Sequence, residues 1–141
     1  MMKDIKLQKG MTHMIQKTVA YEDTTLSFGR SGIETLFSTT SLVGMMIEVT
    51  VNLVGKNIPE GYITISRNMN IIHQKPTLQG MAVTAKAVLE EIEGNKLHFS
   101  ITCYDEVGEI ATGKLERHIV NQNALIKKAH ERAEALEQNS R

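Results

Sequence analysis

One carboxylate, Glu48, stands within an otherwise apolar stretch of the sequence, TTSLVGMMIEVTVN (residues 39–52). Moving an ionised carboxylate out of water without partners costs several kcal/mol, or the group neutralises instead. A carboxylate held in a dry site is a strong base, because a low dielectric raises its proton affinity. The stretch therefore indicates either general-base or nucleophilic chemistry at Glu48, or a polar helix stripe that it shares with Thr50 and Asn52.

Two further side chains could take part in hydrolytic chemistry. Thr40 belongs to a run of hydroxyl residues, STTS (38–41), which can cap a helix or join the helix-start amides as an oxyanion donor. In a helix, Thr40 and Glu48 would lie about 12 Å apart along the axis, so a substrate or a third residue has to lie between them. His73 is a candidate for that third residue, and a satisfied histidine at a strand end is the alternative.

The hydrophobic pattern predicts the elements that position these residues. The apolar run 39–54 is long for a strand and ordinary for a helix, so we expect a helix that is apolar nearly all round and therefore buried. Alternation of apolar and polar residues predicts five strands, at 11–21, 62–73, 82–93, 96–106 and 109–121. An antiparallel sheet wrapped around one central helix, an α+β architecture, satisfies all of these patterns.

Length and composition narrow the class of protein. With 141 residues we expect one domain over 1–141, with a core at about 11–121 and a C-terminal surface helix over 122–138. Sixteen basic residues balance sixteen acidic ones, and only 4% of residues are aromatic, which argues against a nucleic-acid partner. No apolar run approaches the ~20 residues of a membrane-spanning helix, so we expect no membrane partner.

The single cysteine and the five histidines carry separate expectations. Cys103 cannot form an internal disulfide, which fits a cytoplasmic protein, as does an N-terminus without a signal-peptide core. It falls on an apolar strand face and is expected to be a small buried hydrophobe. The histidines show no metal-ligand spacing, so we expect no metal.

Several segments together resemble one known family. These are TTSLVGMMIE (39–48), IIHQKPTLQGMAV (71–83), LEEIEGNKLHFSITCYDEVGEIATG (89–113) and ERHIVN (116–121). They are similar to the hotdog-fold thioesterases, and more narrowly to the fluoroacetyl-CoA thioesterase-like family. The resemblance implies a hotdog fold and hydrolysis of a small acyl-CoA thioester, with coenzyme A as part of the substrate and no separate cofactor. It also implies a homodimer, paired edge to edge with sites near the seam.

The resemblance assigns roles to particular residues. A catalytic threonine and glutamate eight residues apart match Thr40 and Glu48, and a histidine before a Pro- and Gly-containing turn matches His73.

Arg117 falls on the apolar face of 109–121, and a core-facing arginine needs a partner or an opening. A carboxylate could be its structural partner, whereas contact with the substrate or a CoA phosphate would make it a substrate-binding residue.

Other functions are less well supported by the residues. A hotdog protein that binds acyl-CoA without hydrolysing it is the main alternative, and the joint presence of Thr40, Glu48 and His73 argues against it. A hydratase would need an Asp and a His in a short Pro-containing segment, which we do not find. The Gly-x-x-Gly match in FGRSGIETL (28–36) resembles the backbone clamp of a KH domain, but four-residue matches are common by chance.

Overall fold

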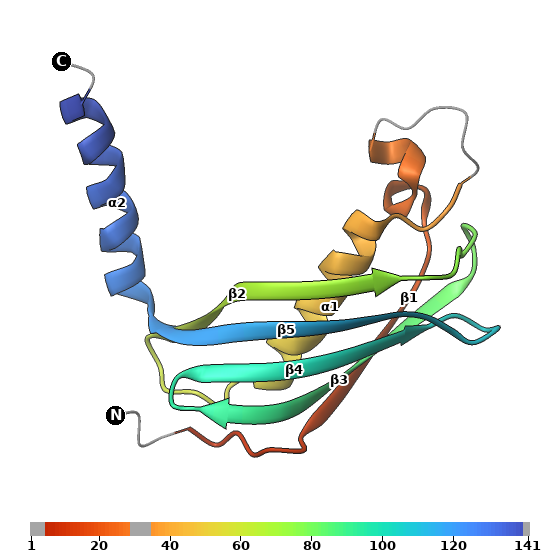
Figure 1. The fold of residues 1–141 in the computed structure, drawn as a ribbon, viewed down its shortest axis with the longest axis horizontal. Coiled ribbons are helices and arrows are strands. Elements are labelled where there is room, and N and C mark those ends of the chain that lie inside the picture. The colour runs from red at the N-terminus through yellow and green to blue at the C-terminus, as the bar shows by residue number, and fades with distance from the viewer. Residues whose placement is uncertain (1–4, 29–34, 140–141) are drawn as a thin grey trace.

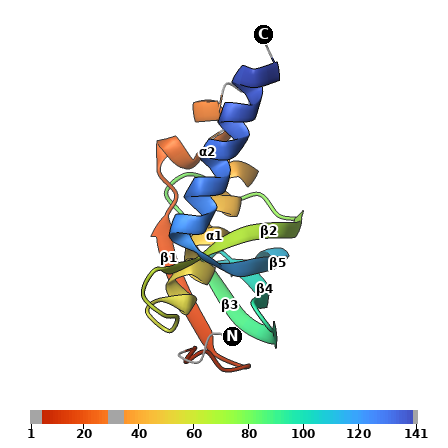
Figure 2. The ribbon, with the colours of Figure 1, turned by 90° about the vertical axis from the view of Figure 1, so that its left-hand side faces the viewer.

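The computed structural model describes residues 5–28 and 35–139, so the KH-like Gly-x-x-Gly match lies largely outside the described residues. Five strands form one antiparallel sheet in the order β1–β3–β4–β5–β2 (Figure 1). The strands are β1 (Thr12–Thr18), β2 (Tyr62–His73), β3 (Ala82–Glu93), β4 (Lys96–Tyr104) and β5 (Glu109–Asn121), and the helices are α1 (Thr39–Val54) and α2 (Gln122–Asn139). The sheet curves around α1, with β1 on one side and the other strands on the opposite side (Figure 2).

The predicted helix over 39–54 is confirmed as α1, and its ends have clear local causes. Ser38 is the N-cap, and its side chain accepts a hydrogen bond of 3.0 Å from the backbone N–H of Ser41. At the other end, Gly55 adopts a positive φ of 50° and its N–H donates to the carbonyl of Val51. These caps explain why the helix begins and ends where the apolar run does.

The expectation that α1 is buried nearly all round is wrong for the protomer. One side of the helix packs into the core and supplies most of its buried residues: Leu42, Met45, Met46, Val49, Thr50, Leu53 and Val54. The helix is exposed along its length at Thr39, Thr40, Gly44, Glu48, Val51 and Asn52. The apolar composition of α1 thus leaves an uncovered side that includes the candidate carboxylate.

The alternating segments form the strands that their patterns predict. The segments 62–73, 82–93 and 109–121 match β2, β3 and β5, whereas β1 and β4 are shorter than expected. Along β4, four alternate residues from Leu97 to Cys103 are buried in the core that also contains the buried residues of α1, while their neighbours are less buried. The sheet therefore presents one apolar face to the helix, which is the arrangement that the pattern predicts.

Two features of the fold lie at its margins. β2 is an edge strand of twelve residues that pairs only with β5 among the described strands. α2 follows β5 directly, has no buried residue, and projects away from the sheet (Figure 1). Neither described helix is long and apolar enough to cross a membrane.

Candidate active site

The start of α1 is held firmly against the segment that precedes it. The backbone N–H of Ser38 donates to the carbonyl of Asp23, at the end of a short 3-10 turn (Tyr21–Asp23), at 2.8 Å. Phe37, which precedes the Ser38 cap, is buried, and its N–H donates to the carbonyl of Thr77 at 2.8 Å. Because these contacts fix the helix start, the side chains of its first turn have defined positions.

His73, at the end of β2, meets the first turn of α1. Its Nδ1 atom lies 2.9 Å from the Thr39 hydroxyl oxygen, within hydrogen-bond distance. The ring of Phe37 meets the imidazole edge to face, with centroids 6.5 Å apart and an interplanar angle of 73°. The structure thus brings the predicted histidine to the predicted helix start, and the threonine that it contacts is Thr39.

The His73 imidazole is half-buried, and this changes its titration. Burial lowers the pKa of His73 from its usual 6.5, because desolvation disfavours the charged ring, and a backbone hydrogen bond at Lys75 opposes part of the effect. His73 is therefore neutral at neutral pH. A neutral imidazole has one nitrogen that donates and one that accepts, which suits proton transfer.

Thr40 and Glu48 both lie on the exposed side of α1. Ser38 is the cap, so the Thr40 hydroxyl is not needed to cap the helix. Glu48 is also exposed, and the expectation that it lies in a dry environment within the protomer is wrong. The two side chains are separated by about 12 Å along the helix, with the exposed Gly44 midway between them.

Arg117 is buried on the inner face of β5, as its position in the sequence predicts, with 4% of its surface exposed. Its Nε donates to the Thr64 hydroxyl at 2.8 Å, Nη1 to the Ser66 hydroxyl at 2.8 Å and Nη2 to the Thr64 carbonyl at 2.9 Å. These partners on β2 are neutral, so the expected carboxylate pairing is absent from its hydrogen bonds with described residues. Burial lowers the pKa of the guanidinium from its usual value, because desolvation disfavours the charged form.

Arg117, on β5, and His73, at the end of β2, lie far apart along the sheet within one protomer. Arg117 pairs with Ser66 across the sheet, whereas His73 pairs with Ala111. His73 lies seven residue steps beyond Ser66 along β2, a distance of about 23 Å. A single protomer therefore does not bring Arg117 to His73.

Cys103 is buried, and burial raises the pKa of its thiol to about 12. A thiol with so high a pKa is not a nucleophile at neutral pH, in agreement with the expected role of a small hydrophobe. Among the residues that the structure describes, no group of three or more histidine, cysteine, aspartate or glutamate side chains could hold a metal ion.

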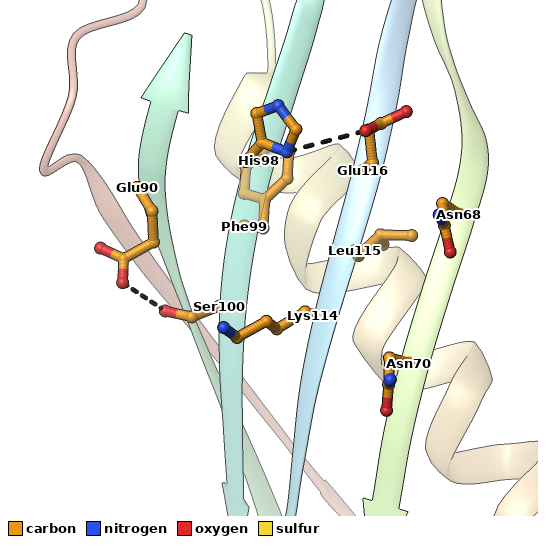
Figure 3. A pocket seen from close by; sticks show the side chains of 9 residues that line it. All are labelled: Asn68, Asn70, Glu90, His98, Phe99, Ser100, Lys114, Leu115 and Glu116. Carbon is orange, nitrogen blue, oxygen red and sulfur yellow. Dashed lines mark hydrogen bonds and ion pairs between the residues drawn. The ribbon is translucent and has the colours of Figure 1, made fainter.

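A separate hollow of about 460 Å³ lies on the outer face of the sheet (Figure 3). In it, Ser100 donates to Glu90 at 3.0 Å, and Nδ1 of His98 lies 3.8 Å from Glu116. Figure 3 shows α1 behind the sheet and these polar side chains in front of it. The hollow is therefore on the opposite face from His73 and the α1 start, and it is not part of the candidate site.

Sequence reasoning missed two residues of this region. Thr39 contacts His73, although only its neighbour Thr40 had been singled out. Ser38 takes the cap, although all four residues of STTS were candidates. A run of hydroxyl residues indicates a helix start but does not tell which hydroxyl faces the strand, because that depends on the angle at which the helix meets the sheet.

Comparison with known proteins shows which family this chain is similar to. The family model described as fluoroacetyl-CoA-specific thioesterase, FlK, matches residues 19–123. A fluoroacetyl-CoA thioesterase from Streptantibioticus cattleyicolor is 26% identical over 100 residues, which cover 71% of this chain and 72% of that protein.

Two solved structures show the same fold. A hot-dog-like protein from Thermanaerovibrio acidaminovorans has a TM-score of 0.84 at 26% identity and covers 89% of this chain and 93% of its own. A phenylalanine-to-alanine mutant of FlK in complex with fluoroacetate and CoA has a TM-score of 0.78 at 22% identity, covering 84% of this chain and 99% of its own.

The curved antiparallel sheet around α1 is a hotdog fold, and the family match defines the chain as a hotdog-fold thioester hydrolase. More narrowly, the chain belongs to the fluoroacetyl-CoA-specific thioesterase family. The predicted fold, enzyme class and family are confirmed.

Proposed function

We propose that this chain hydrolyses the thioester bond of an acyl-CoA that carries a small acyl group. The observation that carries the proposal is the contact between His73 and the first turn of α1, where the imidazole is held 2.9 Å from the Thr39 hydroxyl. That arrangement puts a neutral imidazole and a threonine hydroxyl together at a helix start, where backbone N–H groups favour a developing negative charge. Family membership supports the same chemistry.

The proposed reaction uses three side chains. Glu48 takes a proton from water, and the resulting hydroxide adds to the carbonyl carbon of the thioester. The Thr40 hydroxyl donates a hydrogen bond to the oxyanion that forms. As the oxyanion collapses, the C–S bond breaks and the CoA thiolate leaves, taking a proton delivered through His73.

A second route has Glu48 as the nucleophile. Its carboxylate would then add to the carbonyl carbon and expel the thiolate, leaving a mixed anhydride that water hydrolyses. Hydrolysis in ¹⁸O-labelled water under single-turnover conditions separates the routes, since only the nucleophilic route transfers label into the Glu48 carboxylate. In both routes, water and the thioester suffice, and no cofactor is required.

We also propose that the active form is a homodimer joined through β2. An exposed edge of twelve residues offers unpaired backbone groups to a second chain. When two copies of a strand pair antiparallel about its middle, the His73 end of one lies beside the Tyr62 end of the other. Since Arg117 bonds to Thr64 and Ser66 near that end, the partner's Arg117 would approach the site around His73.

This dimer gives Arg117 a role in substrate binding across the seam. It also covers the exposed side of α1, which supplies the dry surroundings for Glu48 that the protomer lacks. Light scattering at micromolar concentration is expected to give twice the 15.7 kDa of the chain. A particle of 15.7 kDa that retains full activity would contradict the composite site.

The function is tested with a panel of short, aromatic and long acyl-CoA esters, by following release of free thiol. We expect turnover on short esters and its loss in Glu48→Gln. Thiol release absent from the whole panel, with acyl-CoA binding retained by calorimetry, would favour the non-catalytic acyl-CoA binder instead. Matched acyl-carrier-protein thioesters in the same assay determine which carrier is used. A cytoplasmic location is proposed on the sequence grounds given above and is tested by cell fractionation.

A further inference from the structure

The C-terminal helix α2 carries an apolar stripe that its own protomer leaves uncovered. The stripe follows the three- and four-residue spacing that places side chains on one side of a helix, and it consists of Ile126, Ala129, Ala133 and Leu136. Ile126 is 50% exposed and Leu136 is 73% exposed, and α2 has no buried residue. Because most helical stability in proteins comes from packing of an apolar face, this stripe needs a surface to pack against.

An apolar groove of about 720 Å³ lies at the other end of the sheet. We call it the turn groove, because it lies between the β2–β3 turn (74–81) and the β4–β5 hairpin turn (105–108). Its apolar lining consists of Leu36, Pro76, Leu78, Met81, Val107 and Ile110. Leu78 is 50% exposed and Val107 is 88% exposed, so the groove is also uncovered within the protomer.

α2 begins beside the first residue of β2. Asn121, the last residue of β5, pairs with Tyr62, and the N–H of Gln122 donates to the carbonyl of Gly61 at 2.9 Å. From there α2 extends past β2, on the side of the sheet where no further described strand follows (Figure 1). A second chain paired with β2 would occupy that side, so α2 projects toward the partner.

The turn groove begins where β2 ends. The N–H groups of Gln74 and Lys75, directly after His73, donate to the carbonyl of Ile110 at 2.9 and 3.2 Å. In the proposed homodimer, the Tyr62 end of one β2 lies beside the His73 end of the other. The pairing therefore brings each α2 to the partner's turn groove, whereas α2 and the turn groove of one chain lie at opposite ends of the sheet (Figure 1).

The charges beside the two apolar surfaces are complementary. Lys128 and Arg132 lie one turn apart along one border of the stripe. Asp105 and Glu109 line the turn groove from the hairpin side, and Lys75 lines it from the side of the β2–β3 turn. A helix with its basic border toward the acidic hairpin places opposite charges together, which favours one orientation of α2 in the groove.

We propose that the turn groove is the docking site for α2 of a second copy of this chain, with the apolar stripe packed on the apolar lining. The two protomers thus exchange their C-terminal helices, in addition to pairing their β2 strands. This inference rests on the homodimer of the proposed function. Because the groove adjoins His73, the partner's α2 also supports the turn that directly follows this residue.

Crosslinking between introduced cysteines tests the contact directly. Val107→Cys places a thiol on the turn groove and Ala133→Cys places one on the stripe, while the buried Cys103, whose thiol pKa is raised to about 12, does not compete. A short bismaleimide is expected to convert the double variant into a covalent dimer. Each single variant measures the linking between identical positions, which is subtracted.

Glu131→Cys is the matched control for Ala133→Cys. The two positions are nearly level along α2 but about 200° apart around its axis, so Glu131 faces away from the stripe. Val107→Cys combined with Glu131→Cys is expected to give little covalent dimer. Equal linking from both positions, or none from Ala133→Cys, would overturn the docking of the stripe.

Ile126→Gln tests how much the docked helix contributes to the dimer. The dissociation constant of the dimer, measured by sedimentation equilibrium, is expected to rise at least about tenfold, because a symmetric dimer loses the apolar contact twice. Lys127→Gln, at the neighbouring position on the polar side, should change it less than about twofold. Circular dichroism checks that both variants are folded. An unchanged dissociation constant in Ile126→Gln would contradict the proposal.

Thiol release by the parent protein separates this inference from the proposed function. A parent dimer that hydrolyses acyl-CoA but gives no stripe-specific crosslink would overturn the docking of α2 alone. A parent that crosslinks through the stripe but releases no thiol would overturn the proposed hydrolysis and leave the docking in place. A monomeric parent would overturn both the homodimer and the docking. A raised KM for long acyl-CoA esters in Val107→Glu, with an unchanged dimer, would assign the groove to substrate instead.

Discussion

Met46 of α1 rests directly on Gly113 of β5. A Cβ atom built at Gly113 would lie 2.9 Å from Met46 Sδ and 3.2 Å from Met46 Cε. Met46 is fully buried at 0% exposure, so its side chain has little room to move aside. The absence of a side chain at position 113 therefore sets how closely the centre of the helix approaches the sheet.

Gly113→Ala is expected to destabilise the protein by overpacking this contact. Inserting a methyl group into a well-packed core typically costs about 1–3 kcal/mol, because the neighbours leave their preferred rotamers. Urea unfolding followed by circular dichroism measures the change in the free energy of unfolding. A double variant with Met46→Ala should recover part of the loss at position 113, and strict additivity would show that the two residues do not interact.

Gly44→Ala is the matched substitution on the exposed side of α1. A Cβ at Gly44 meets nothing within 4 Å, and alanine is favoured over glycine inside a helix by about 1 kcal/mol, so the free energy of unfolding should rise. Gly44 lies between Thr40 and Glu48, where the proposed substrate has to fit. Turnover is expected to fall, more for bulky acyl groups than for acetyl, whereas unchanged turnover with every ester would place the substrate elsewhere.

Thr40→Ser is expected to keep most of the activity, and Thr40→Ala to lose most of it. The hydroxyl is the group required to stabilise the oxyanion, and removing such a donor lowers kcat about 10²- to 10³-fold. Because Ser38 is the helix cap, Thr40→Ala should not lower the melting temperature. The comparison needs kcat and melting curves of both variants. A Thr40→Ala enzyme with intact turnover and a lower melting temperature would show that Thr40 is structural.

Glu48→Gln is expected to abolish nearly all turnover while binding of acyl-CoA and the melting temperature are retained. The amide keeps the shape and hydrogen-bonding capacity of the side chain but cannot act as a base. Since Glu48 is exposed in the protomer, its charge should contribute little to protomer stability. Steady-state thiol release and calorimetric binding are the measurements. Retained activity with lost stability would instead identify Glu48 as a structural residue.

Asp23→Asn tests the support beneath the start of α1 through its pH dependence. Burial tends to raise the pKa of the Asp23 carboxyl, but the Lys17 ammonium at 2.7 Å, the Ala20 N–H at 2.9 Å and a hydrogen bond from Ser41 together lower it below 3.8. A carboxyl with a lowered folded-state pKa contributes stability above its unfolded-state pKa and loses it as the pH falls through the folded value. The parent should therefore lose stability as the pH falls below about 4.

The Asp23→Asn protein is expected to be less stable by about 1–3 kcal/mol at neutral pH, because charge-assisted hydrogen bonds are lost. The difference from the parent should shrink as the pH falls below the ordinary aspartate value. Urea unfolding at pH 7 and at pH 3 measures both quantities. A stability difference that is independent of pH would show that the Asp23 charge is not responsible.

The sequence by itself determined the elements and the class of protein. Alternation with period two predicts β2, β3 and β5 with their observed bounds, and in β3 and β5 alternate residues along much of the strand are buried in the core. The apolar run 39–54 predicts α1 because its length exceeds that of an ordinary strand. These are local properties, because they depend only on residues that are close together in the sequence. The family follows from motifs that are likewise contiguous in the chain.

Only the tertiary structure decided how the candidate residues meet. Whether Thr39 or Thr40 contacts His73 depends on how α1 is rotated relative to the end of β2. These two elements are distant in the sequence, so no local pattern fixes that rotation. The exposure of Glu48 was mispredicted because an apolar helix signals burial without telling whether the same chain or a second chain covers it. The hydroxyl partners of Arg117 on β2 depend on strand order and register. Contacts between distant segments are set by packing geometry, which the periodicity of residues along the chain does not predict.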